Sequence, residues 1–415
     1  MAQTGIGRFN GLPKEIVVIM LGLALTATVG FDLVGSSARR SASPATKARL
    51  HVPSTTTSTA PPAASATTTS VAPTVPVIST TTPPPPHIPI HVVSNVAPAP
   101  KPVRAAPVAQ PASARSALTI PFGVYVGSGD PSGVRSFAAS TGSHPVYAAD
   151  YLPRNEGWAG VSNGSTVSWI TGQWRGSGYT LVLGVPIIPT DGGGSPQGTL
   201  AAGAAGQYNS YFATLANSLV SGGAPNAVLR LGWEFNGNWY PWSVTNTTDA
   251  ANFAAYFRNI VNAMRSVPGQ AFKFVWNPNA GGSFGGAYTP DQAYPGSAYV
   301  DYVGIDIYDQ GWSSPPTPQN AWANQLSQSW GLNWLAAFSA AQGRPIVLPE
   351  WGVDITGDGH GMGDDPYFIN QVGSWIVQNN VAWTAYFNYD APDGAHDLLN
   401  GQFNATLSAF RTVFG

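Results

Sequence analysis

The feature that most constrains the fold is a repeat of short apolar runs, separated by longer segments, that begins near residue 120 and continues to residue 388. Eight runs are rich in apolar, β-branched or aromatic residues: Ile120–Val126, Pro145–Ala149, Thr180–Ile187, Ala227–Trp233, Phe272–Trp276, Tyr302–Tyr308, Pro345–Pro349 and Ala382–Asn388. Several intervening segments are helix-like: Gly206–Val220, Thr248–Val267, Trp322–Ala341 and Pro366–Gln378. Alternating strands and helices indicate a parallel sheet, and eight such units predict a (β/α)8 TIM barrel.

The clearest helix signal lies in Thr248–Val267, where apolar side chains follow a threonine cap at helical spacing. A doubly wound sheet is the alternative architecture. However, the turn after Val126 reads Gly127-Ser128-Gly129-Asp130 and lacks the third glycine of a phosphate-binding turn. The barrel is therefore favoured.

The residues before the barrel have a different composition and divide into two segments. Residues 1–38 contain an apolar run, residues 16–31, preceded by Arg8 and Lys14, which is expected to be either a cleaved signal peptide or a retained membrane anchor. Residues 39–118 are rich in Pro, Thr, Ser and Ala, so we expect a disordered linker. Residues 119–415 are then expected to form the barrel domain, and the protein is expected to be extracellular or on the cell surface.

Charge excludes some functions. Residues 1–129 hold nine basic and two acidic residues, whereas residues 130–415 hold nine basic and 18 acidic residues. An acidic domain with 14 tryptophans offers no basic patch for a phosphate backbone, so no nucleic acid is expected as a partner. The absence of cysteine excludes disulfides and thiol chemistry.

Two carboxylates stand out as candidate catalytic groups. The domain has only three glutamates, of which Glu234 ends the fourth apolar run and Glu350 ends the seventh. In a TIM barrel, the ends of the strands carry the active site. Strand alternation predicts that Arg230, Gly232 and Glu234 share a face, that Ile346, Leu348 and Glu350 do so, and that Asp306 shares one with Tyr308. A carboxylate pair in a cleft suits glycosidic bond cleavage.

Aromatic residues near the strand ends are candidates for stacking on sugar rings. Six tryptophans lie at or just past the predicted ends: Trp239, Trp242, Trp276, Trp312, Trp351 and Trp383. Core packing is the alternative role for any one of them, but together they are expected to line a groove.

Three motifs resemble glycoside hydrolase family 26, the β-mannanase-like members of a retaining (β/α)8 clan. They are Arg230-x-x-x-Glu234-x-x-Gly237-x-Trp239-x-x-Trp242, Trp276-Asn277-Pro278-Asn279 together with Val300–Asp309, and Pro349-Glu350-Trp351-Gly352. The resemblance covers about residues 120–415. It implies that Glu234 is the acid/base, that Glu350 is the nucleophile, and that Tyr308 hydrogen-bonds the nucleophile.

One position departs from the family pattern. Where the family usually has histidine before the acid/base glutamate, this chain has Trp233, whose ring nitrogen cannot accept a hydrogen bond. We expect Trp233 to stack or pack at the mouth and consider Asn236 and Asn277 candidates for binding the sugar 2-hydroxyl. Arg230, Trp233, Asn236 and Asn277 thus join Tyr308 and the tryptophans Trp239, Trp242, Trp276, Trp351 and Trp383 as expected substrate-binding residues.

The sequence indicates no cofactor. Its histidines lack ligand spacing, so no metal centre is expected, and the Gly-rich segment with Asp354, Asp358, Asp364 and Asp365 is interpreted as a solvated loop because its spacing differs from that of an EF-hand. We expect a monomeric enzyme that acts on a polysaccharide. Two alternatives remain open at this point: a non-catalytic carbohydrate-binding or wall-associated protein, and a structural surface protein.

Overall fold

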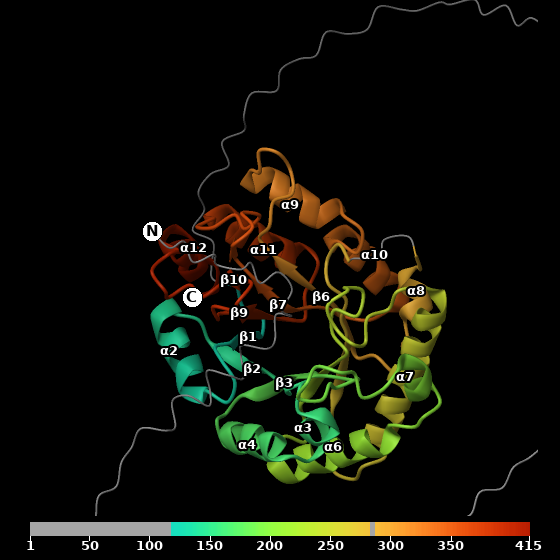
Figure 1. The fold of residues 1–415 in the computed structure, drawn as a ribbon. Helices are drawn as coiled ribbons and strands as arrows, with labels where there is room; N and C mark the ends of the chain where they lie inside the picture. Colours follow the sequence, from blue (N-terminus) through green and yellow to red (C-terminus); the bar gives the residue numbers. More distant parts are fainter. Residues whose placement is uncertain (1–117, 283–286) are drawn as a thin grey trace, which may run out of the picture. The chain divides into compact units, whose positions relative to one another are not determined.

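A computed structural model describes residues 118–282 and 287–415. Eight parallel strands close into a barrel in chain order, which confirms the predicted (β/α)8 architecture (Figure 1). The strands are β1 (Phe122–Tyr125), β2 (Pro145–Tyr151), β3 (Thr180–Val185), β4 (Val228–Leu231), β5 (Lys273–Trp276), β6 (Tyr302–Tyr308), β7 (Ile346–Gly352) and β9 (Trp383–Phe387). Each of the eight predicted runs overlaps one of these strands, and β2 and β7 extend past the ends of their runs. Two short strands, β8 (Ile355–Thr356) and β10 (Gly394–Ala395), pair antiparallel after the ends of β7 and β9.

Helices surround the barrel (Figure 1). They are α2 (Pro131–Thr141), α3 (Gly157–Ser162), α4 (Ser165–Trp174), α5 (Leu200–Ala204), α6 (Asn209–Gly222), α7 (Thr247–Arg265), α8 (Pro290–Ala293), α9 (Pro318–Ser327), α10 (Leu332–Gln342), α11 (Pro366–Gln378) and α12 (Asn404–Phe414). The helix expected in Pro366–Gln378 is α11, with the same bounds, and the one expected in Gly206–Val220 is α6.

Helix α7 illustrates how local sequence sets an element. Its buried stripe includes Phe253, Phe257 and Ile260, at the spacing that packs one face of a helix on the barrel. The cap differs from the expected threonine. The Asn246 side chain accepts hydrogen bonds from the backbone N–H groups of Thr248 and Asp249, which satisfies two of the free donors at the helix start.

The single helix expected over Trp322–Ala341 is wrong, because the structure divides this segment into α9 and α10. Helix α9 ends at Ser327, and the connection contains Trp330 with a positive φ of 56°. The backbone of Gly331 packs against the carbonyl groups of Gln325 and Gln328, where a side chain would clash. The apolar residues continue at helical spacing through this corner, so periodicity alone does not reveal it.

The core has two layers, one inside the barrel and one between the barrel and its helices. The inner layer consists of eight buried residues, one from each of six strands and two from β9: Tyr125, Ala149, Val182, Val228, Val275, Val347, Trp383 and Ala385. The outer layer is larger and contains the apolar faces of most helices. Because both faces of each strand are covered, the strands read as continuous apolar runs.

A register shift in β7 corrects one expectation about faces. Between β6 and β7, Gly304 pairs with Val347 while Asp306 pairs with Glu350, so β7 contains one extra residue next to Pro349. Val347 lies in the inner layer, whereas Ile346 and Leu348 belong to the outer one. The bulge therefore returns Glu350 to the inside of the barrel, and the expectation that Ile346, Leu348 and Glu350 share a face is wrong.

The segments expected as signal or anchor and as linker lie outside the described residues, except for Leu118. Among the helices in residues 118–282 and 287–415, none has both the length and the hydropathy that crossing a bilayer requires.

Candidate active site

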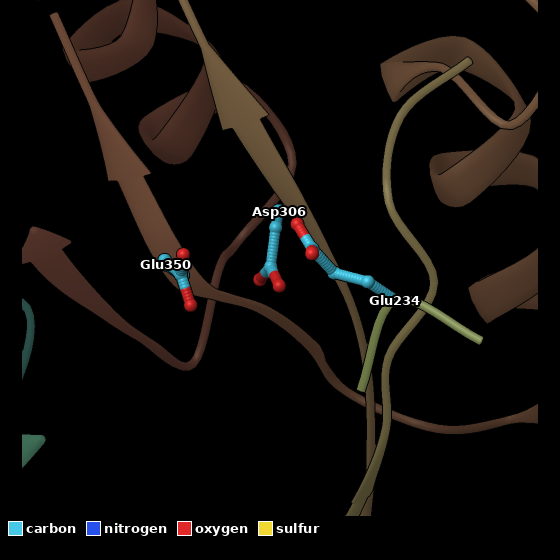
Figure 2. A group of neighbouring side chains, drawn as sticks. All are labelled: Glu234, Asp306 and Glu350. Carbon is cyan, nitrogen blue, oxygen red and sulfur yellow. The ribbon is translucent and has the colours of Figure 1, made fainter. Parts of the chain in front are cut away.

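Three carboxyl groups converge at the carboxyl ends of the strands. Glu234 lies in the loop after β4, Asp306 lies in β6, and Glu350 lies in β7. Figure 2 shows these side chains pointing toward one another. One carboxylate oxygen from each of them lies within 4.8 Å of the other two. The two glutamates that the sequence singled out are thus neighbours, with a third carboxyl group beside them.

Arg230 organises the carboxyl groups from within the barrel. Its guanidinium donates to Asp306 at 2.5 Å and to Glu350 at 2.8 Å, and it also donates to the side-chain oxygen of Asn277 at 2.7 Å. Arg230 is 1% exposed, so these ion pairs are shielded from water. One planar guanidinium group therefore orients both carboxyl groups.

Glu350 receives two further short hydrogen bonds. Tyr308 donates to its Oε1 at 2.6 Å and Tyr151 donates to its Oε2 at 2.6 Å. Burial by itself would raise the pKa of Glu350, but the Arg230 charge and the hydrogen bonds from Tyr151, Tyr308 and Arg230 together lower it below its ordinary value. The structure thus stabilises Glu350 as a carboxylate.

Asp306 is held differently. It is fully buried, accepts from the Asn277 side chain at 3.1 Å and pairs with Arg230. Burial, followed by the charges of Glu350 and Glu234, raises the pKa of Asp306, although Arg230 opposes the shift. Three ionised carboxyl groups beside one guanidinium would carry a net charge of −2. Their mutual repulsion favours keeping one proton in the cluster.

The same ion pairs bear on metal binding. The three carboxyl groups are close enough to share a cation. However, the guanidinium of Arg230 already supplies positive charge to Asp306 and Glu350, and two tyrosine hydroxyls donate to Glu350. A cation would have to displace these donors, so the donor set fits acid–base chemistry better than a metal centre.

Glu234 has an uncommon backbone conformation. Its φ is +52°, which few non-glycine residues adopt, and Gly232, two residues earlier, has a φ of +55°. The conformation is tied down because the Glu234 N–H donates to the carbonyl of Asn277 at 2.8 Å. Trp239 donates from its indole nitrogen to Glu234 Oε2 at 2.8 Å. Holding such a backbone costs about 1–3 kcal/mol, and strain of this kind clusters at functional sites.

Four of the six tryptophans do not line the expected groove. Trp242, Trp276 and Trp351 are fully buried and Trp383 is 1% exposed. Trp276 stacks on Phe338 between barrel and helices, and Trp351 packs against Phe414 of α12. Trp383 begins β9, at the opposite end of the barrel from the carboxyl groups. These four rings pack in the core and offer no face to a ligand.

Trp239 and Trp312 have different surroundings. Trp239 is half-buried and contacts Glu234, whereas Trp312 is 60% exposed on the loop after β6. Trp233 is only 3% exposed and donates to the hydroxyl of Tyr240 at 3.1 Å. The Trp233 ring therefore packs beneath the mouth, as one of the two expectations had it, next to the ring of Tyr151.

The two asparagine candidates serve the backbone around Glu234. Asn236 accepts from the N–H of Asn279 at 2.7 Å and donates to the carbonyl of Asn279 at 2.7 Å. Asn277 bridges Arg230 and Asp306. Both side chains are 1% exposed. Both asparagines support the site through these hydrogen bonds, and neither presents a free polar group to a ligand.

Sequence reasoning missed two residues of the site. Tyr151 lies at the end of β2 and reaches Glu350 across the barrel, accepting from Arg230 at 3.0 Å as well. Strand alternation places Asp306 on the same face as Tyr308 but does not single it out as a candidate. Both residues lie near the carboxyl end of a strand. Barrel enzymes carry their active-site residues at this end, so position alone could have identified them.

A second pair of carboxyl groups is buried outside this cluster. Asp309 follows β6 and is 1% exposed, and Asp365 caps α11 and is 4% exposed. The Oδ2 atoms of Asp309 and Asp365 are both buried without another hydrogen-bond partner, so one proton shared between the two side chains would satisfy both. Burial, and then the charge of Asp365, raises the pKa of Asp309 well above its usual range. With Asp354 also 2% exposed, the interpretation of this region as a solvated loop is wrong for Asp354 and Asp365.

Replacing Asp309 by asparagine is expected to flatten the pH dependence of stability. The folded state keeps a proton on Asp309 that the unfolded state loses above about pH 3.9, so wild-type stability falls as pH rises from there toward the raised pKa. The side-chain amide of asparagine can donate a hydrogen bond to Asp365 and carries no titratable proton. We expect the variant to melt about 2–4 °C higher than wild type near pH 8, corresponding to about 1 kcal/mol, with no such gain near pH 4.

Circular dichroism melts from pH 4 to 9 would measure this difference. Asp291→Asn, at an exposed position in the first turn of α8, is the matched control and should track the wild type. Parallel curves for wild type and Asp309→Asn would contradict the shared proton.

Comparison with known proteins places the site in context. Residues 206–350 match the family model described as Glycosyl hydrolase family 26. Endoglucanase H of Acetivibrio thermocellus is 30% identical over 160 residues, which cover 35% of this chain and 16% of that protein. A mannan endo-1,4-beta-mannosidase of Bifidobacterium adolescentis is 30% identical over 159 residues, or 37% of this chain and 15% of that protein. The chain thus spans about one sixth of the length of the curated relatives it matches.

The fold also resembles solved structures. A modular endo-β-1,4-mannanase from Cellulomonas fimi superposes with a TM-score of 0.50 at 20% identity, covering 70% of this chain and 69% of that one. A double mutant of a Cellulomonas fimi endo-β-1,4-mannanase gives a TM-score of 0.51 at 19% identity, covering 70% of each chain. At these identities the likeness establishes a common fold.

Proposed function

We propose that this chain, which belongs to glycoside hydrolase family 26, is an endo-acting retaining β-glycosidase that cleaves a β-mannan-like or other neutral β-glycan. Glu234 is the acid/base and Glu350 is the nucleophile. The observation that carries the proposal is the approach of their carboxylate oxygens to within 4.8 Å. Retaining enzymes hold their carboxyl groups about 5–5.5 Å apart, whereas inverting enzymes leave about 6.5–9.5 Å for a water.

In the first step, a Glu350 oxygen attacks the anomeric carbon while the bond to the leaving oxygen breaks. Glu234 transfers its proton to that oxygen, so that the aglycone leaves as a neutral alcohol. Arg230 and the two tyrosines keep Glu350 ionised and aimed at the mouth. The anomeric carbon then carries a covalent ester to Glu350 with inverted configuration.

In the second step, Glu234 acts as a base. It removes a proton from a water molecule whose oxygen attacks the anomeric carbon, and the bond to Glu350 breaks. The second inversion restores the original configuration, Glu350 returns as a carboxylate, and Glu234 is protonated for the next cycle. The Trp239 indole N–H holds the Glu234 carboxylate in place during both transfers.

Substrate recognition at the reacting sugar is expected to differ from that of enzymes with histidine before the acid/base residue. Trp233 donates to Tyr240 and packs below the mouth, so its ring nitrogen is not directed at a sugar hydroxyl. The expected substrates are therefore neutral β-glycans as a class.

Export and domain organisation are properties of the whole protein. An export signal or anchor in residues 1–38 and a linker in residues 39–118 would place a monomeric enzyme outside the cell, where polysaccharides are encountered. The alternative of a non-catalytic carbohydrate-binding protein is weakened by the close glutamate pair with its ordered donors.

The test is a hydrolysis screen of the full chain against mannan, glucomannan, mixed-linkage glucan, cellulose and xylan. Proton NMR of the first-formed reducing ends gives the stereochemistry. We expect internal cleavage with retained β configuration. Glu350→Gln serves as the blank for contaminating activity. Products of inverted configuration would refute the assigned roles, and glycan binding without cleavage would favour the non-catalytic alternative.

Gly237 provides a prediction that depends on the position of Trp239. A Cβ atom at Gly237 would lie 2.4 Å from the indole ring of Trp239, so an alanine must push the indole away from Glu234. We expect Gly237→Ala to lower kcat/KM roughly 10- to 100-fold, the loss that a displacement of about 1 Å brings. Gly172→Ala is the matched control, because no atom lies within 4 Å of its Cβ position. Equal activity of the two variants would contradict the role of Trp239.

A further inference from the structure

An exposed tryptophan stacks on a histidine at the same end of the barrel as the carboxyl groups. Trp312 has 60% of its surface exposed, and its ring lies over that of His360 at a centroid distance of 3.9 Å and an angle of 25°. Trp312 lies on the loop after β6 and His360 on the loop after β8. One face of the indole is thus covered by the imidazole, and much of the ring remains open to solvent.

The two loops are joined by backbone hydrogen bonds on both sides of the stack. The Gly311 N–H donates to the carbonyl of His360 at 2.8 Å, and the Met362 N–H donates to the carbonyl of Asp309 at 3.0 Å. The His360 ring nitrogen Nδ1 contacts the carbonyl of Gly311 at 3.1 Å. Gly311 itself has no room for a side chain, because a Cβ would lie 2.6 Å from the sulfur of Met362. These hydrogen bonds between the two loops, together with the close packing at Gly311, therefore hold the aromatic pair in place.

The position of the pair relates it to the catalytic groups. Trp312 follows Tyr308, which donates to Glu350, by four residues, so their Cα atoms are at most about 15 Å apart. Asp358 accepts from the His360 N–H at 3.1 Å and lies exposed next to the stack. A flat apolar ring beside a negative charge suits a neutral sugar and disfavours an acidic one.

We infer that Trp312, supported by His360, forms a distal subsite that stacks on one sugar ring of a neutral glycan chain extending from the catalytic pair, an inference that rests on the proposed function. Apolar C–H groups of the sugar would cover the open indole face. His360 is a positioning residue, since it touches the indole and not the sugar. The subsite contributes only when the glycan is long enough to reach it.

The experiment compares short and long substrates of the glycan that the full chain cleaves. For Trp312→Ala we expect kcat/KM on a hexasaccharide to fall about tenfold, as the loss of one aromatic stacking contact predicts, with the activity on an aryl monoglycoside or disaccharide unchanged. Trp312→Phe should retain most of the activity on the hexasaccharide. Val377→Ala is the control for loss of an exposed apolar side chain, because Val377 is 59% exposed near the end of α11.

Binding provides a readout that does not depend on catalysis. Isothermal titration calorimetry of Glu350→Gln with the hexasaccharides of mannose, glucose and xylose should show about tenfold weaker binding when Trp312→Ala is added. His360→Ala should weaken binding less, and His360→Phe should restore it. If wild type binds but cleaves nothing, the proposed function fails while this result still supports the subsite. Equal affinity with and without Trp312, or no binding to any hexasaccharide, would overturn the subsite.

Discussion

Glu350→Ala is expected to lower kcat by several orders of magnitude while the fold is retained. The variant lacks the oxygen that would form the covalent intermediate, and the Arg230 that paired with it keeps Asp306 as a partner. Added azide should fit the vacated space, attack the anomeric carbon from the same side and partly restore turnover, with a glycosyl azide of inverted configuration as the product. NMR of that product, with a circular dichroism melt of the variant, measures both expectations.

Glu156→Ala is the control for this experiment. Glu156 is the third glutamate of the domain, lies exposed at the start of α3 and accepts from Thr166, so its loss should leave kcat unchanged. Near-wild-type activity in Glu350→Ala, or a rescued product of retained configuration, would contradict a nucleophilic role.

The pH profile provides a separate check on the surroundings of Glu350. Because Arg230 and the hydrogen bonds from Tyr151 and Tyr308 lower the pKa of Glu350, the acidic limb of the kcat/KM profile should lie below the ordinary carboxyl range. Tyr151→Phe and Tyr308→Phe each remove one donor to the charged form. Either change should move the acidic limb to higher pH, and an unmoved limb in both variants would show that the limb belongs to another group.

The order of the strands could be predicted because each strand of a parallel barrel is covered on both faces and reads as an apolar run. The same coverage explains what failed. A strand with two apolar faces does not reveal which residues point inward, so Trp276 and Trp351 could not be separated from residues at the mouth. In β7, the bulge beside Pro349 reverses which residues point into the barrel. Strict alternation of side chains along a strand cannot anticipate such a bulge.

The candidate site was predictable to the extent that it depends on rare residue types at strand ends. Glu234 and Glu350 met that condition, and the structure brings them together, although their catalytic roles stay predictions. Tyr151 reaches the site through a contact between strands that are far apart in sequence, with 199 positions separating it from Glu350. The positive φ of Glu234 depends on its bond to the Asn277 carbonyl, which no local pattern encodes.

The role of Glu234 leads to an expected result of a different kind. Glu234→Gln removes the proton donor but keeps the shape of the side chain, and the amide still offers an oxygen to the Trp239 indole N–H. Cleavage of polysaccharide should be abolished, because a sugar alkoxide is a poor leaving group unless it is protonated. Formation of the glycosyl-enzyme from a dinitrophenyl glycoside should proceed, because that leaving group needs no proton.

The second step should then become limiting, since the glutamine cannot activate water. Stopped-flow assays of Glu234→Gln with the dinitrophenyl glycoside are therefore expected to show a burst of phenolate close to one equivalent of enzyme, followed by slow turnover. Azide, which attacks without base assistance, should accelerate that slow phase and give a product of retained configuration. This stereochemistry distinguishes Glu234 from Glu350, whose alanine variant yields the inverted azide. A variant that loses the polysaccharide and dinitrophenyl glycoside activities in equal proportion, without a burst, would remove Glu234 from the acid/base role.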